Sequence, residues 1–402
     1  MPTVRSNLIG LTRAELEDLA LDLGQPRYRG RQLYHGLYRR LLQDPDELTT
    51  IDRALRREIA SRYLVAYPVV LREITSRDQS IRYLLGLADG ESVEAVYMPW
   101  RPEQRNGRAV ATPSGRELRS RAEVVRSGFT PLESEAEEPR TTLCISSQVG
   151  CAVGCSFCFT GLLGARRSLT TGEIVGQVLA IARQRGLWAR TARTDHPQGK
   201  TGWAAKSSPR VNIVFMGQGE PLLNLRAVMS AVGILADTEG CAIPLRRITI
   251  STAGIVPRIY DLAREAARPK LAISLNASND EQRDVLMPIN RKYPLRMLME
   301  ACRAYPLRPR ERLTFEYVML DGVNDAHADA GRVAALLDRL PARVNLIPYN
   351  GGAALSYRPS PMERVYSFQK RLRERGVPAF IRISRGQDIM AACGQLSLEG
   401  RS

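Results

Sequence analysis

The feature that most constrains the fold of this chain is a regular alternation of strand-like and helix-like segments from residue 141 onward. Six segments have the length and apolar composition of buried strands, namely residues 141–147, 211–217, 246–252, 270–276, 313–320 and 343–350. Helical stretches lie between them, and the first begins with the capping-box pattern Thr170-x-x-Glu173. This alternation predicts an α/β fold with a parallel sheet of about six strands, as a partial barrel or a doubly wound sheet. In both architectures, ligands bind at the C-terminal ends of the strands.

The remaining segments differ in their patterns. Residues 10–65 have helical spacing of apolar residues, whereas residues 68–98 have the two-residue period of strands. Residues 100–140 are poor in apolar residues and rich in Arg and Glu. We therefore predict a small N-terminal helical accessory domain (1–66), a short antiparallel β extension (67–99), a flexible charged insertion or linker (100–140), a barrel domain (141–396) and a tail (397–402).

The charge of the chain favours a polyanionic partner. Lys and Arg number 58 against 42 Asp and Glu, which gives a formal charge of +16, and such a surface favours binding to RNA. The alternative is an arginine-rich composition without a binding role. The N-terminal helices carry Arg27, Arg29, Arg31, Arg39 and Arg40, which lie either against RNA phosphate or on a solvated helix face. A second basic segment, 186–210, is predicted to be a surface loop near RNA.

Composition also limits the class of protein. Hydrophobic residues make up 44% of the chain, but no apolar run approaches the roughly 18 residues that a membrane span needs. The N-terminus has no secretory signal, so we expect a cytoplasmic protein without a membrane partner. The seven cysteines are then thiols, metal ligands or redox catalysts rather than structural disulfides. Three scattered histidines argue against a His-based zinc enzyme or a Ser-His-Asp hydrolase.

The strongest chemical signal is a C-x3-C-x2-C loop directly after the first barrel strand. It contains Cys151, Cys155 and Cys158. Three thiolates on one short loop can hold three irons of a [4Fe–4S] cluster and leave the fourth iron open to another molecule, whereas electron-transfer ferredoxins fill all four positions with Cys. The alternative is a zinc ion with a fourth ligand from elsewhere in the chain.

This loop on a barrel of about six strands resembles the radical S-adenosylmethionine (SAM) superfamily. Further motifs are similar to one branch of it, the RNA adenine methyltransferases of the RlmN/Cfr type, and closest to the RlmN-like branch. These motifs are TLCISSQVGCAVGCSFC (142–158), MGQGEPLLN (216–224), ITISTAGIVP (248–257), LAISLNASND (271–280), EYVMLDGVND (316–325), VNLIPYN (344–350) and RGQDIMAACGQL (385–396). The resemblance implies a radical SAM partial (β/α)6 barrel, with a [4Fe–4S] cluster and SAM as cofactors.

The resemblance also assigns roles to single residues. It makes Cys151, Cys155 and Cys158 the cluster ligands and places Phe157 beside the SAM adenine. The SAM-contacting positions that it implies are Gly219, Glu220, Ser251, Ser274, Leu275, Asn276 and Asn350. Each of these seven lies at a predicted strand end, where the architecture independently places a ligand.

Three more assignments concern catalysis. The resemblance makes Cys393 the methyl carrier, Cys144 the thiol that releases the product by forming a disulfide with it, and Glu94 a proton acceptor. The implied reaction methylates carbon 2 of an adenine in 23S rRNA, and also one in the tRNA anticodon loop, with two SAM molecules per turnover. The implied partners are these RNAs and an electron donor such as flavodoxin, and we expect a monomer.

The sequence departs from the family at Asn276, where His is usual, and at Phe159, which replaces a small residue. Asn276 can hydrogen-bond SAM but cannot titrate, so an acid–base role there is in doubt. Two other functions stay open at this point. One is the Cfr-like methylation of adenine carbon 8, which confers antibiotic resistance. The other is a non-catalytic iron–sulfur protein that only binds RNA.

Overall fold

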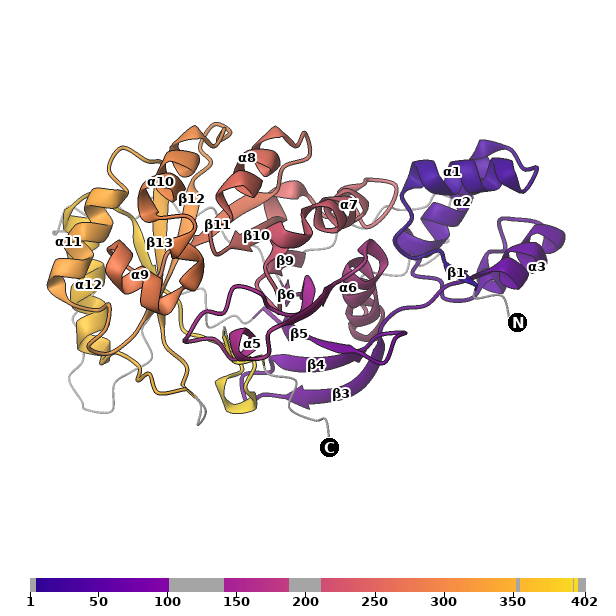
Figure 1. Cartoon of the computed structure of the whole chain (residues 1–402). Coiled ribbons are helices and arrows are strands. Elements are labelled where there is room, and N and C mark those ends of the chain that lie inside the picture. The colour runs from indigo at the N-terminus through magenta and orange to yellow at the C-terminus, as the bar shows by residue number, and fades with distance from the viewer. Residues whose placement is uncertain (1–4, 101–140, 188–210, 352–354, 393, 397–402) are drawn as a thin grey trace, which may run out of the picture.

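The computed structural model describes residues 5–100, 141–187, 211–351, 355–392 and 394–396 (Figure 1). Nearly all of the two predicted insertions, 100–140 and 186–210, therefore lie outside the described residues. The tail 397–402 and Cys393 also lie outside them.

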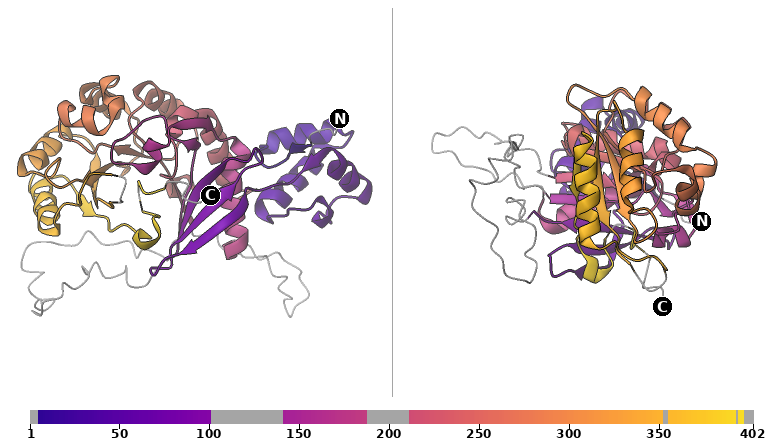
Figure 2. Two further views of the ribbon diagram at one scale, coloured as in Figure 1. Left: turned by 60° about the horizontal axis from the view of Figure 1, so that its bottom comes forward. Right: turned by 90° about the vertical axis from the view of Figure 1, so that its left-hand side faces the viewer.

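Most strands in the described part of the chain belong to one ten-stranded sheet, in the order β14-β13-β12-β11-β10-β9-β6-β5-β4-β3. Strands β6 and β9 to β14 are parallel. This part of the sheet curves into the predicted partial barrel (Figure 2). The strands are β3 (Val69–Thr75), β4 (Ile81–Gly86), β5 (Ser92–Met98), β6 (Thr141–Cys144), β9 (Val211–Phe215), β10 (Ile248–Thr252), β11 (Lys270–Ser274), β12 (Leu313–Met319), β13 (Ala342–Pro348) and β14 (Ala379–Ile381).

The six predicted barrel strands are all present. Strand β10 ends with its predicted segment at Thr252, and the other five strands end before theirs do. The first, for example, stops at Cys144 although the apolar pattern continues to residue 147. The residues beyond most of these strand ends are buried as well, which is why their composition looks strand-like, whereas Met216 and Gly217 after β9 are half-buried. A seventh parallel strand, β14, was not predicted because its three residues are too few to show a period.

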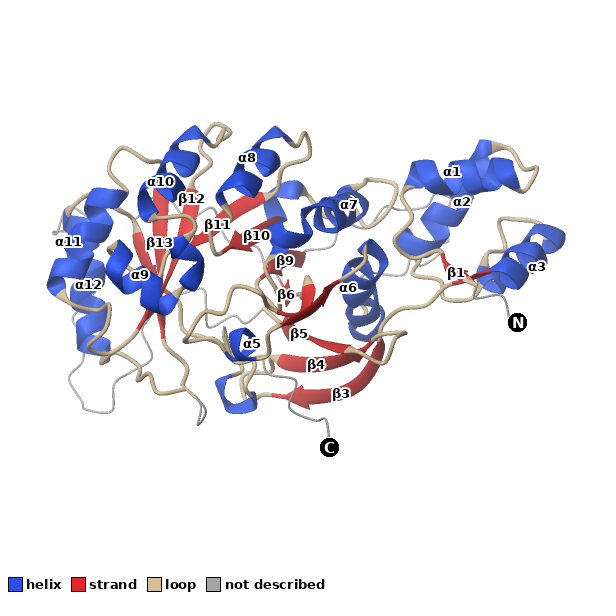
Figure 3. Ribbon diagram, viewed as in Figure 1, coloured by secondary structure: helices blue, strands red, loops and turns tan. Residues whose placement is uncertain are grey.

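Helices line the outer side of the curved sheet (Figure 3). Helix α6 begins with the predicted capping box, in which Thr170 and Glu173 bond each other's backbone N–H. None of the described helices is long and apolar enough to cross a membrane. The helices of the barrel region are α5 (Phe159–Leu162), α6 (Thr171–Arg185), α7 (Leu225–Ala236), α8 (Val256–Arg264), α9 (Asp280–Leu286), α10 (Leu295–Ala304), α11 (His327–Leu336) and α12 (Met362–Glu374), with short 3-10 turns η4 (Pro221–Asn224), η5 (Leu245–Arg247), η6 (Pro288–Arg291) and η7 (Gln387–Ile389).

The antiparallel strands β3 to β5 continue the barrel sheet rather than forming a sheet of their own. Strand β5 pairs with β6, with Val96 opposite Cys144. Glu94 is therefore two residues along β5 from the rung that contains Cys144. The sheet brings the strand of the predicted proton acceptor next to the strand of the predicted product-releasing thiol.

The N-terminal helices form a bundle at one end of the sheet, beside α6 and α7 (Figure 1). Helix α1 has a capping box made by Thr12 and Glu15. Arg183 of α6 donates a hydrogen bond to the Leu41 carbonyl at 2.7 Å, and one continuous apolar core joins the bundle to the barrel. The elements of this region are β1 (Ser6–Asn7), α1 (Arg13–Asp22), α2 (Arg27–Tyr34), the π-helical turn η1 (His35–Arg39), η2 (Pro45–Glu47), α3 (Arg53–Arg62) and β2 (Tyr63–Leu64).

Three of the arginines that were predicted to contact either RNA or solvent form ion pairs or hydrogen bonds within this bundle. Arg27 lies 3.2 Å from Asp18, and Arg31 donates a hydrogen bond to Glu17 at 2.9 Å. Arg29 bonds the Thr50 carbonyl. RNA would have to compete with these contacts or bind around them.

Candidate active site

The three-cysteine loop lies between β7 (Gln148–Gly150) and α5, and glycine sets its path. Gly150 has a φ of +76°, and a Cβ on it would lie 1.8 Å from the Gly164 carbonyl oxygen. This close approach lets the Cys151 N–H bond that same carbonyl at 2.9 Å. Strand β8 (Ala165–Ser168) then pairs with β7. The loop is thus fixed at both ends before any cofactor binds.

The thiols of Cys151, Cys155 and Cys158 are half-buried at the edge of an apolar group. Burial raises the pKa of all three, that of Cys151 to about 12, and the charges of neighbouring thiolates raise the pKa of Cys151 and Cys155 further. Three half-buried thiols whose charges act on one another would be costly as free thiolates. Iron supplies the positive charge that offsets this cost, so the donor set fits a [4Fe–4S] cluster.

Among the described side chains, no group of three or more His, Cys, Asp or Glu residues is arranged to hold a metal ion. The choice between zinc and an iron–sulfur cluster therefore follows from the family to which the chain belongs.

An apolar wall borders the cysteine loop. Phe157 is buried and packs with Val153, Leu286 and Tyr349, and the three cysteines lie at the edge of this group. The Ser156 N–H bonds the Leu286 carbonyl at 3.0 Å, which fixes the loop to the end of α9. Such a surface suits one face of a planar base, so the position of Phe157 is compatible with the predicted adenine contact.

Glu220 connects the ends of two neighbouring strands. Its carboxylate accepts hydrogen bonds from the backbone N–H groups of Leu222 at 3.0 Å and Ala253 at 2.7 Å. Burial raises the pKa of Glu220 to about 7. Next to it, Gly219 has a φ of +97°, and a Cβ there would lie 2.6 Å from the Gln148 side chain. Only glycine fits this turn beside the cysteine loop.

The raised pKa of Glu220 predicts a pH-dependent stability in protein free of cluster and SAM. The native state keeps its proton up to about pH 7, whereas the unfolded chain loses it near 4.5. The free energy of unfolding should therefore fall across this interval, by up to about 3 kcal/mol. Urea unfolding at several pH values checks this. The decline should be smaller in Glu220→Gln, and equal slopes in the two proteins would contradict it.

The other predicted SAM positions also lie at the C-terminal ends of the barrel strands, which we call the rim of the barrel. Ser251 lies on β10 and Ser274 at the end of β11, both half-buried, with Leu275 fully buried after them. Asn276 has a φ of +55°, a conformation that Asn tolerates better than most residues. Its Oδ1 accepts a bond from the Val318 N–H at 2.9 Å. In this structure the Asn276 amide therefore joins β11 to β12.

Asn350 follows β13 and lies further round this rim. Its amide donates a hydrogen bond to the Ser384 hydroxyl at 2.6 Å, at the start of the C-terminal segment. The fold therefore brings every described SAM-contacting candidate to the C-terminal ends of the parallel strands. Whether these residues bind SAM stays a prediction.

Sequence reasoning missed Arg283 on α9, which is fully buried. Its guanidinium donates to the carbonyls of Ala253, Ser274 and Leu275, at 2.6, 3.2 and 3.2 Å. Its positive charge also lowers the pKa of the Cys155 thiol, against the larger effect of burial. Arg283 therefore caps the ends of β10 and β11 beside the cysteine loop. A lone Arg in a helix normally indicates an exposed position, so the sequence carried no signal for this role.

Replacing Arg283 should be costly because the three carbonyls would lose their donors. We expect Arg283→Met to reduce the free energy of unfolding by about 3 kcal/mol or more. The matched control is Arg296→Met on α10, whose side chain is 79% exposed and should change stability by less than about 0.5 kcal/mol. Urea unfolding of both variants tests this, and similar values for the two would contradict it.

Cys144 lies in a small apolar cluster with Val96, Ala391 and Leu396. The chain around position 393 therefore packs on β5 and β6. It is also bonded to the cysteine loop, since the Phe159 N–H donates to the Gly394 carbonyl at 2.8 Å. Cys393 itself lies outside the described residues, but Ala391 and Leu396 on either side of it pack with Cys144.

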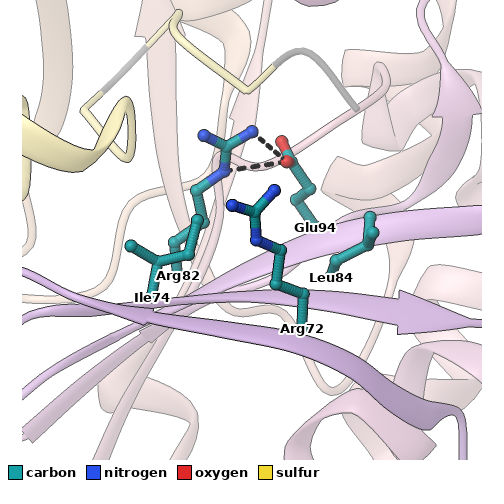
Figure 4. A pocket seen from close by; sticks show the side chains of 5 residues that line it. All are labelled: Arg72, Ile74, Arg82, Leu84 and Glu94. Carbon is teal, nitrogen blue, oxygen red and sulfur yellow. Dashed lines mark hydrogen bonds and ion pairs between the residues drawn. The ribbon is translucent and has the colours of Figure 1, made fainter. Parts of the chain in front are cut away.

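Glu94 is buried on β5 and forms an ion pair with Arg82 of β4, as Figure 4 shows. Arg82 Nε donates to Glu94 at 2.8 Å, and its Nη1 donates to the Ile389 carbonyl at 3.1 Å. One guanidinium therefore joins the predicted proton acceptor to the segment that leads to Cys393. Arg72 of β3 lines the same pocket. The role of Glu94 in proton transfer stays a prediction.

Comparison with known proteins agrees with this architecture. Residues 6–65 match the ribosomal RNA large subunit methyltransferase N-terminal domain, and residues 202–331 match the radical SAM superfamily. A Koribacter versatilis protein named "Probable dual-specificity RNA methyltransferase RlmN" is 46% identical over 93% of this chain and 96% of its own length. The dual-specificity RNA methyltransferase RlmN of an Anaeromyxobacter species is 42% identical over 99% and 92%. The chain belongs to the RlmN family.

A solved relative supports the fold of this RlmN-family protein over its whole length. The crystal structure of a radical SAM methyltransferase from Sphaerobacter thermophilus superposes on this chain with a TM-score of 0.79 and 42% sequence identity. The match includes 97% of this chain and 99% of the Sphaerobacter chain. The partial-barrel fold class is thereby confirmed. As a radical SAM enzyme, the protein uses a [4Fe–4S] cluster and SAM.

Proposed function

We propose that this enzyme methylates carbon 2 of an adenine in 23S rRNA, with Cys393 as the methyl carrier. The observation that carries the proposal is the packing of the chain around position 393. Ala391 and Leu396 pack on Cys144, and Gly394 bonds the cysteine loop. The described residues on either side of position 393 thus contact Cys144 and the helix that follows the cysteine loop, which supports a methyl carrier at this position.

The chemistry of the substrate explains why such a site is needed. Carbon 2 of adenine lies between two ring nitrogens and is electron-poor, so it cannot displace the methyl group of SAM as a thiolate can. A thiolate at Cys393 performs that displacement readily. When bound, the cluster and SAM supply a 5'-deoxyadenosyl radical, which activates the carried methyl group for addition to the base.

The two cysteines also account for release of the product. After the addition, the adduct radical gives up one electron to the flavodoxin-type electron carrier of the proposal and loses the proton on carbon 2 to a base, for which Glu94 is the candidate. The adenine ring is then aromatic again, and a thioether joins Cys393 to the carbon attached to it. The Cys144 thiolate attacks the Cys393 sulfur, so that an S–S bond forms and the S–C bond breaks. The electron pair of that bond goes to the carbon, which takes up a proton and becomes the methyl group. The enzyme then needs an external two-electron reductant to restore both thiols.

The remaining parts of the proposal concern partners and location. An adenine of the tRNA anticodon loop is the second substrate, in keeping with the dual-specificity names of the relatives. The net charge of +16 supports phosphate contacts with both RNAs, and binding should weaken as salt increases.

The target base must leave its stack to reach the barrel mouth. A flavodoxin-type donor supplies electrons, and the enzyme acts as a monomer in the cytoplasm.

The decisive experiment supplies anaerobically reconstituted enzyme with methyl-labelled SAM, a reductant and either 23S rRNA fragments or tRNA. Mass spectrometry of the digested RNA should find the label on carbon 2 of one adenosine. Label on carbon 8 would instead establish the Cfr-like reaction. Absence of labelled RNA and of 5'-deoxyadenosine, with RNA binding retained, would overturn the proposal in favour of a non-catalytic RNA-binding protein.

A further inference from the structure

A short segment near the C-terminus is held against a turn that lies more than 300 positions earlier in the chain. The turn, residues 76–80, connects β3 to β4, and the segment is residues 385–389. Both lie at the bottom of the molecule in Figure 1, where the C-terminal segment (yellow) approaches β3. We call this contact the turn anchor.

Two carboxylates form the centre of the turn anchor. Asp388 of the segment accepts bonds from the Ser76 hydroxyl at 2.5 Å and from the Arg77 N–H at 3.0 Å. Asp78 of the turn accepts bonds from the Gly386 N–H at 3.1 Å and from Arg385 Nε at 3.3 Å. Each side thus contributes one Asp that accepts hydrogen bonds from the other side.

Further bonds surround the two carboxylates. Arg385 donates to the carbonyls of Asp78 at 3.0 Å and Pro99 at 2.6 Å, and Arg82 donates to that of Ile389. Although burial opposes it, hydrogen bonds from Ser80, Ser76 and Gly386 lower the pKa of Asp78 to about 2. The anchor therefore keeps its charge at neutral pH, and charge-assisted bonds of this kind are stronger than neutral ones.

Beyond the turn anchor, the segment bends tightly toward Cys144. Gly386 has a φ of +65° and Met390 one of +54°, and the Ala391 N–H bonds the Gly386 carbonyl at 2.9 Å. Ala391 then packs on Cys144. On the other side of position 393, the Leu396 carbonyl accepts a bond from Thr160 at 2.8 Å. In the sequence, position 393 thus falls between two fixed points, the turn anchor and helix α5, which follows the cysteine loop.

We propose that Asp78 and Asp388 are positioning residues that hold the segment leading to Cys393 against the β3–β4 turn and so keep its thiol within reach of Cys144. The inference rests on the proposed function for the roles of the two thiols. If the anchor is lost, one of the two fixed points is lost, and Cys393 samples more positions. The effective concentration of one thiol at the other then falls.

The direct test measures the equilibrium between the two thiols without RNA or SAM. Anaerobically prepared holoenzyme, in which the cluster protects its three cysteine ligands, is equilibrated with mixtures of reduced and oxidised glutathione. Formation of one disulfide consumes one glutathione disulfide and gives two glutathione thiols and the Cys144–Cys393 bond. Alkylation and peptide mass spectrometry then give the equilibrium constant, which is proportional to the effective concentration of the thiols.

The double variant Asp78→Asn/Asp388→Asn should lower this equilibrium constant by about tenfold or more, because several charge-assisted bonds are weakened together. Hydrogen exchange of residues 385–392 should accelerate in parallel. The matched control is Asp89→Asn in the neighbouring β4–β5 turn, where Asp89 pairs with Arg167 and not with the C-terminal segment. It should stay within twofold of the wild type in both measurements. Circular dichroism and iron content show whether each variant is folded.

The possible failures are distinguishable. A folded double variant with wild-type equilibrium constant and wild-type exchange rates overturns the turn anchor. If the wild-type holoenzyme forms no Cys144–Cys393 disulfide under oxidising conditions, the proposed product-releasing pair is wrong. Hydrogen exchange of residues 385–392 alone then decides whether the turn holds the segment.

Discussion

Replacing Cys393 with alanine should abolish methylation of RNA, by about 1,000-fold or more, because the enzyme then has no thiolate to accept the first methyl group. Cleavage of SAM should persist at a low level, since the cysteine loop and the strand ends are unchanged. Incubation with methyl-labelled SAM and ribosomal RNA fragments, followed by separate assays of labelled RNA and of 5'-deoxyadenosine, measures both effects.

The control for Cys393→Ala is Cys241→Ala, a buried cysteine whose thiol donates to the Tyr38 carbonyl in the N-terminal part of the core, away from the cysteine loop. This variant should lose some stability but keep its methyl transfer. Methylated RNA from Cys393→Ala at a rate near that of the wild type would remove the carrier role from this residue.

A second large effect is expected for Cys144→Ala. Methyl transfer to Cys393 and addition to the base should proceed, but the thioether that joins protein and RNA cannot be broken without the attacking thiol. We expect a stable adduct in stoichiometric amounts and a fall in multiple turnover of about 100-fold or more. Denaturing electrophoresis with labelled RNA detects the adduct as a shifted band that resists boiling.

Because Cys144 is buried among apolar side chains, its replacement by alanine should test the thiol without unfolding the protein. Its apolar neighbours Val96, Ala391 and Leu396 tolerate a methyl group with only a small cavity, so the fold should survive. Free turnover of RNA by Cys144→Ala, with no adduct, would show that another group releases the product. Cys144→Ser is a further comparison, because a hydroxyl preserves the volume but cannot form the disulfide.

The barrel could be predicted from the sequence because short, largely apolar strand segments alternate regularly with helical segments. The C-x3-C-x2-C loop was equally visible, since its spacing is local. Continuity of the sheet was not predictable, because residues 99–140 separate β5 from β6 in the chain. Their pairing through Val96 and Cys144 depends on tertiary structure alone.

The same limit applies to the residues that support the site. Arg283 is buried because its guanidinium hydrogen-bonds three carbonyls at the ends of β10 and β11. No local sequence pattern predicts that these carbonyls lie beside it. The bond of Arg82 to Ile389, and those that Asp78 and Asp388 accept across the turn anchor, join positions that are more than 300 residues apart. Motifs reveal the groups that perform chemistry, whereas the groups that hold them in place become visible only in three dimensions.

The single sheet has a consequence for dissecting the enzyme. A fragment that begins at residue 141 would retain the whole parallel barrel but would leave the backbone N–H and C=O groups on one side of β6 without the partner strand β5. Exposed edges of this kind recruit other chains and promote aggregation. The antiparallel strands therefore protect the edge of the catalytic barrel by pairing with β6. A minimal catalytic fragment should retain residues 67–99.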